Sequence, residues 1–221
     1  VMVIGLLLTV VIGWLAGGLG NWLADQLPHL PERTLHFDRE RYWRALRQPW
    51  QADAGDTAAR PWRTVLLDVG MAAAFAIGWV RFGDNVAQLF VVWLYTVWLL
   101  VVLVIDLEHR RVLNLMLPAA IVVALLAPLL TLAGWTDGPE VGSVLLGGLA
   151  AFLVFAVIFI VGRGRMMGAG DVKLAGVIGL MVGYPLVWAA LASGIFLGGL
   201  AAIFLIVRSR AAAKSYMAYG P

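Results

Sequence analysis

The fold of this 221-residue chain is constrained most by a series of long, uninterrupted apolar runs. Residues 86–105, for example, are about as long as the helix that crosses the hydrocarbon of a bilayer. Hydrophobic residues make up 62% of the chain and charged residues 13%, so a soluble domain could not hide its apolar surface from water. Membrane β-barrels are built from short segments that alternate apolar and polar residues, unlike these runs. The sequence therefore predicts an all-α, polytopic transmembrane helical bundle.

Seven apolar runs predict about seven spans in a single membrane-embedded domain, residues 1–221. The runs cover residues 1–24, 64–80, 86–105, 113–133, 141–162, 173–184 and 186–207. The sixth is short and is expected to end at Tyr184, because Pro185 disfavours helix in the residue before it. Paired glycines at 147–148 and 198–199 predict close helix packing.

Basic residues lie almost entirely in alternate connections between these runs. Of the 16 Lys and Arg residues, all except Arg81 fall in four connections that share one face of the membrane. Because cytoplasmic loops are enriched in Lys and Arg, the N-terminus is predicted outside and residues 25–63 form a cytoplasmic loop. The net charge of +3 has the same explanation, so no nucleic-acid partner is expected.

Two acidic residues stand at the predicted cytoplasmic edge of the membrane. Asp106 ends the third run, and Asp171 closes a G-A-G-D segment and opens the sixth. Ionisable groups at this depth are often functional, although an aspartate can also cap a helix or be solvated. Gly168 and Gly170 can adopt a positive φ and let another chain approach closely. Two neighbouring carboxylates can share a proton, so that one activates water while the other protonates a scissile carbonyl.

Other hydrolytic chemistries find no matching residues. The chain contains no cysteine and no H-E-x-x-H motif, so no metal site and no cofactor are expected. The three histidines lie in or near predicted cytoplasmic loops, where no Ser-His-Asp arrangement competes. An aspartyl protease needs neither a metal nor a cysteine, and it fits these absences.

The aspartate segments resemble those of the type IV prepilin peptidases, which are G-x-G-D membrane aspartyl proteases. Residues 105–114, IDLEHRRVLN, are similar to the first aspartate motif of that family, and residues 168–174, GAGDVKL, to the second. Residues 17–28 are similar to its first-helix end, and residues 218–221 to a segment that precedes its last helix. The resemblance covers nearly the whole chain, and it predicts an eighth span that is missing at the C-terminus.

The resemblance implies a protease of the bacterial inner membrane. Such an enzyme removes the short basic leader of prepilins or pseudopilins at the cytoplasmic face, in the service of a pilus or secretion machinery. It implies that Asp106 and Asp171 are the catalytic pair and that Gly168 and Gly170 shape the adjoining loop. Lys173 is expected to support the site locally or to act only as a positive-inside residue.

The chain departs from the family in two places. Many members carry paired C-x-x-C motifs in the first cytoplasmic loop, which bind zinc beside an N-methyltransferase activity; their absence here predicts no zinc and leaves methylation doubtful. Leu113 stands where the family often has proline. Because a basic leader must approach a basic face, Glu108 and lipid headgroups are predicted to help recognise it.

Two other functional classes stay open. A G-x-G-D protease with other membrane substrates would carry its first aspartate deep in a helix, whereas Asp106 is predicted at a helix end. The second open class is a non-catalytic assembly subunit or a small transporter. Transporters place polar residues near the midplane, but apart from the edge aspartates the spans hold little charge besides Asp68.

Overall fold

The computed structural model describes residues 2–27, 61–109, 116–164 and 167–217, which form helices and turns and contain no strand. The helices in chain order are α1 (Met2–Gln26), α3 (Pro61–Thr64), the π-helical η2 (Val65–Val69), α4 (Gly70–Phe82), α5 (Val86–His109), α6 (Met116–Leu132), α7 (Val141–Val161), α8 (Ala169–Val182) and α9 (Leu186–Met217). Elements α3, η2 and α4 follow one another without a break. The predicted all-α bundle is confirmed.

Each predicted apolar run coincides with a helix, or with the unbroken stretch from α3 to α4. Four helical stretches are long and apolar enough to cross a bilayer: Met2–Asp25, Val65–Phe82, Val86–Glu108 and Val141–Val161. Helix α6 and the Leu186–Leu200 part of α9 are apolar but shorter. Helix α8 has only 14 residues, and Tyr184 and Pro185 lie in the turn that follows it, as predicted.

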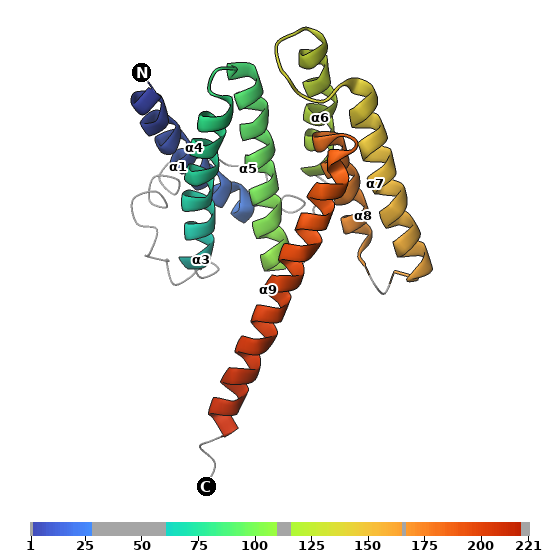
Figure 1. Ribbon diagram of the computed structural model, residues 1–221. Coiled ribbons are helices and arrows are strands. Elements are labelled where there is room, and N and C mark those ends of the chain that lie inside the picture. Colours follow the sequence, from blue (N-terminus) through green and yellow to red (C-terminus); the bar gives the residue numbers. More distant parts are fainter. Residues whose placement is uncertain (1, 28–60, 110–115, 165–166, 218–221) are drawn as a thin grey trace.

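Successive helices run back and forth between two ends of the bundle (Figure 1). The connections from α4 to α5, α6 to α7 and α8 to α9 lie at one end. Element α3, the last turn of α5 and the start of α8 lie at the other, which is called the aspartate end below. Helix α9 continues beyond the rest of the bundle on this side (Figure 1).

The charge pattern follows these ends. By their places in the helices and turns, Arg63, Arg163 and Lys173 belong to the aspartate end, and Arg81 belongs to the opposite end. Most of the predicted cytoplasmic loop, residues 28–60, lies outside the described residues. The ends of that predicted loop are helical, because residues 25–26 close α1 and residues 61–63 belong to α3.

A cluster of buried side chains fixes the helices at the aspartate end. Leu67 from η2, Met71 from α4 and Ile105 from α5 are each at most 1% exposed and pack in one core cluster with Ala24 of α1 and Met116 of α6. The cluster joins the first half of the chain to the start of the second. It therefore supports the turn of α5 that carries Asp106.

Helices α7 and α8 pack with their backbones in contact. A Cβ atom added to Gly179 would lie 2.4 Å from the carbonyl oxygen of Gly147, which is closer than real side chains approach. The predicted packing role of residues 147–148 is therefore confirmed. Around Gly198 and Gly199 an added Cβ would meet no described atom within 4 Å, so the predicted close packing is not seen there among the described residues.

Candidate active site

Asp106 lies in the last turn of α5. The helix does not end at this residue as predicted, but continues through Leu107 and Glu108 to His109. The Asp106 side chain is half-buried, and the preceding Val104 and Ile105 are 0% and 1% exposed. Packing of these two neighbours fixes the backbone from which the carboxylate projects.

Asp171 lies in the first turn of α8, where it caps the helix. Its Oδ2 atom accepts a hydrogen bond of 3.1 Å from the Gly168 amide, and its own amide donates one of 3.2 Å to the Gly168 carbonyl. This reciprocal pairing satisfies amides that a helix N-terminus leaves free, and the helix dipole favours negative charge there. It explains why α8 begins at Ala169 rather than at the predicted residue 173.

The glycines before Asp171 do not adopt the predicted positive φ. Gly168 has a φ of −76° and a ψ of 150°, and Gly170 is part of the helix. The left-handed residues lie a few positions earlier, at Arg163 (φ 50°) and Gly164 (φ 69°). Gly168 provides open space instead, because an added Cβ would make only ordinary contacts, the closest being 3.5 Å from Asp171 Oδ2.

The two predicted aspartates lie close enough to influence each other through their charges. The negative charge of Asp171 acts on the Asp106 carboxyl, although the two residues belong to different helices. Leu174, one turn after Asp171, packs against the core cluster that includes Ile105. The two predicted site residues therefore lie near each other at the aspartate end.

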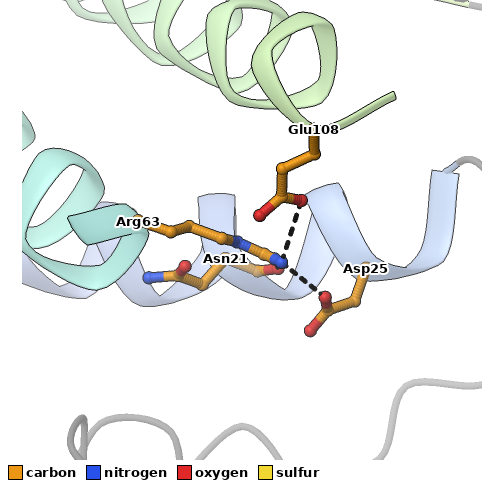
Figure 2. Close-up of polar contacts among 4 residues, drawn as sticks. All are labelled: Asn21, Asp25, Arg63 and Glu108. Atoms are coloured by element: carbon orange, nitrogen blue, oxygen red, sulfur yellow. Dashed lines mark hydrogen bonds and ion pairs between the residues drawn. The ribbon is translucent and has the colours of Figure 1, made fainter. Parts of the chain in front are cut away.

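Glu108 has an internal partner. Its Oε2 atom is 3.3 Å from Arg63 Nη1, and both side chains are 11% exposed (Figure 2). Its predicted role in recognising a basic leader stays a prediction. A leader that binds this carboxylate has to compete with Arg63 for it.

Arg63 belongs to the site although no sequence pattern singled it out. Its Nη1 atom also lies 2.7 Å from Asp25 Oδ1, and its Nη2 atom donates a hydrogen bond to the Asn21 carbonyl (Figure 2). The Asn21 side chain in turn donates a hydrogen bond of 3.1 Å to the buried Asp68. These partners come from segments far apart in the sequence, so charge counting placed Arg63 only among the positive-inside residues.

Lys173 is exposed on α8, two residues after Asp171. Its predicted supporting role is not decided by this position. Within the described part of the chain, His, Cys, Asp and Glu side chains do not gather in groups of three that could hold a metal ion. The expectation that no metal or cofactor takes part stays a prediction.

Comparison with known proteins gives the relatives of this chain. Residues 93–206 match the model of the type IV leader peptidase family, and this segment contains both Asp106 and Asp171. A prepilin leader peptidase/N-methyltransferase of Bacillus subtilis (strain 168) is 30% identical over 154 residues, which is 68% of this chain and 58% of that protein. The chain thus spans less than two thirds of this relative, and no solved structure matches it. Because the family match covers more than half of its residues and includes both aspartate segments, the chain belongs to the type IV leader peptidase family.

Proposed function

We propose that this chain is a membrane-embedded aspartic endopeptidase that removes the leader peptide of type IV prepilins or pseudopilins. The observation that carries the proposal is that Asp106 and Asp171, from two different helices, lie close enough for one charge to act on the other carboxyl, inside the segment that matches the family. The name of the Bacillus subtilis relative supports the substrate class. The charge asymmetry of the chain supports cleavage at the cytoplasmic face of the inner membrane.

In the proposed reaction the two carboxyl groups divide the acid and base work. The ionised group removes a proton from water, which attacks the scissile carbonyl carbon, and the protonated group donates its proton to the carbonyl oxygen. The aspartate that took the proton from water then donates it to the leaving amine as the peptide bond breaks, and the other aspartate takes back the hydroxyl proton of the tetrahedral intermediate, which returns the pair to its starting state. Neither step requires a group beyond the two aspartates and one water.

The residues around the pair are proposed to shape the approach of the substrate. Gly168 leaves the space beside Asp171 open, and Gly170 adds no side chain to the same helical turn. Lys173 is exposed on that helix, where it can contact the substrate or lipid headgroups. Glu108 lies two residues beyond Asp106 and is proposed to contact the basic leader.

The test is cleavage of a synthetic peptide with a basic leader, a glycine and an apolar run, followed by mass spectrometry. The purified chain in lipid nanodiscs is compared with Asp106→Asn and Asp171→Asn, which keep the shape of each side chain but remove the ionisable group. Each substitution is expected to lower the cleavage rate about 1000-fold, the scale of acid–base catalysis. Asp84→Asn, an exposed aspartate at the opposite end, is the matched control and should cleave normally.

The outcomes separate the candidate functions. Cleavage after the glycine, lost in both site variants, supports the proposal. Undiminished cleavage in either site variant would remove that aspartate from the reaction. If the unsubstituted chain leaves the peptide intact, the proposal fails and a non-catalytic membrane assembly subunit becomes the better description.

A further inference from the structure

Arg63 joins three separate segments of the chain at the aspartate end. It belongs to α3, and its guanidinium contacts the last turns of both α1 and α5 (Figure 2). The α1 partners are the Asp25 carboxylate, at 2.7 Å, and the Asn21 carbonyl oxygen. The α5 partner is the Glu108 carboxylate, at 3.3 Å. A planar guanidinium with several donors suits such a junction better than an ammonium group.

Burial makes this junction sensitive to the loss of a partner. Arg63 is 9% exposed as a residue, and the Glu108 side chain is 11% exposed. When one member of a buried ion pair is removed, the other charge stays away from water without compensation. The remaining group then has to move toward water or toward another partner.

Glu108 is the side chain that anchors the end of α5. Leu107, beside it, is 54% exposed and contributes little packing. The core contacts of α5 reach Ile105 in this direction, and the following residue is Asp106. The ion pair between Arg63 and Glu108 therefore holds the helical turn that begins with the first aspartate.

We infer that Arg63 is a positioning residue, which holds the last turn of α5 against α1 and thereby fixes Asp106 relative to Asp171. The effect of Arg63 on catalysis rests on the proposed function. Its effect on the position of α5 can be measured whether or not the chain is a protease. Arg63 acts through Glu108 and contacts neither aspartate of the pair in the contacts described above. The site thus depends on the first helix and on α3, although both lie outside the family match at residues 93–206.

The first experiment measures the position of α5 without any substrate. The chain has no cysteine, so Leu19→Cys on α1 and Leu107→Cys in the last turn of α5, which replace side chains 39% and 54% exposed, can carry spin labels. Pulsed electron spin resonance should give one narrow distance distribution for the unsubstituted background. Arg63→Gln should broaden it, and Arg63→Lys, which keeps the charge, should broaden it less.

The control is Arg81→Gln, the same substitution at an exposed arginine of the opposite end. This variant should leave the distance distribution unchanged. If Arg63→Gln does not insert into membranes, the comparison is made with Arg63→Lys and with Glu108→Gln. An unchanged distribution in the Arg63 variants would overturn the inference whatever their activity.

The second experiment separates positioning from substrate binding. With the leader peptide described above, Arg63→Gln should lower kcat by about 100-fold, the effect of displacing a catalytic group by about 1 Å, with KM unchanged. Arg63→Lys should recover part of kcat. A normal kcat together with a broadened distribution would show that Arg63 does not position Asp106. If no form of the chain cleaves the peptide, the proposed function fails, and the spin-label distances alone decide the inference.

Discussion

The ion pairs of Arg63 are expected to contribute different amounts to stability because their acidic side chains differ in burial. Arg63 approaches Asp25 more closely than Glu108, at 2.7 Å against 3.3 Å. Distance alone would therefore make Asp25 the stronger partner. Its side chain is 39% exposed, however, against 11% for Glu108, and water screens an exposed pair efficiently. Burial is therefore expected to outweigh the 0.6 Å difference between the two distances.

The comparison of Asp25→Ala with Glu108→Ala tests this ranking. Glu108→Ala should lower the free energy of unfolding by about 3 kcal/mol, since it leaves a buried arginine short of a partner. Asp25→Ala should cost about 1 kcal/mol or less. Unfolding by increasing fractions of a denaturing detergent measures both. Equal losses, or a larger loss in Asp25→Ala, would contradict the ranking.

Helices α7 and α8 make a close backbone contact. Glycine on both helices lets the backbones touch, so no side chain can be added at the contact without moving a helix. The hydrophobic driving force between helices is weak in lipid, so close van der Waals contact of this kind holds such helices together instead. Because α8 carries Asp171, this contact also sets the place of the second aspartate.

Gly179→Ala should therefore destabilise the bundle. The new methyl group would lie 2.4 Å from the Gly147 carbonyl oxygen, and overpacking of this kind costs about 1–3 kcal/mol. Gly194→Ala on α9 is the matched control, because its Cβ would meet no described atom within 4 Å. That control should be neutral or slightly stabilising, since alanine favours helix by about 1 kcal/mol over glycine. Thermal unfolding in detergent compares the two, and a loss of similar size in both would refute the packing argument.

The sequence predicted where the helices lie, but it predicted the residues at which they begin and end only in part. Continuous apolar runs in a membrane leave few alternatives to helix, so all seven coincide with helical stretches, although only four of the described stretches are long and apolar enough to cross a bilayer. Pro185 also predicted the end of α8 correctly. The start of α8 was missed because it depends on a hydrogen bond between Gly168 and Asp171, which apolar periodicity does not report.

Among the described residues, Arg63, Arg163 and Lys173 lie at the aspartate end and Arg81 at the opposite end, and this asymmetry of basic residues predicts the orientation of the chain in the membrane. Asp84→Cys, beyond α4, should react with an impermeant maleimide added outside intact cells. Arg163→Cys, between α7 and α8, should react only after the membrane is opened. The chain has no cysteine of its own, so each variant has one thiol. The reverse pattern would place the aspartate end outside the cell and contradict the proposed face of cleavage.

Only part of the candidate site could be predicted from the sequence. Asp106 and Asp171 could be found because a carboxylate at the end of an apolar run is costly, and costly residues are rare. Counting the predicted spans placed both aspartates at the same end of the bundle. Arg63 and Asn21 could not be found, because their partners are set by how α1, α3 and α5 pack together rather than by any local pattern.

The short α8 sets the depth at which Asp171 lies. In the antiparallel contact, Gly179 faces Gly147 and Gly176 faces Phe152, so α7 continues past the level of Asp171 to Val161 by roughly one turn, about 5 Å. The first turn of α8, which carries Asp171, therefore lies short of the end of α7. The proposed hydrolysis needs water at that depth, and the exposed residues Gly168 and Ala169 offer it an entry bordered by backbone and a single methyl group.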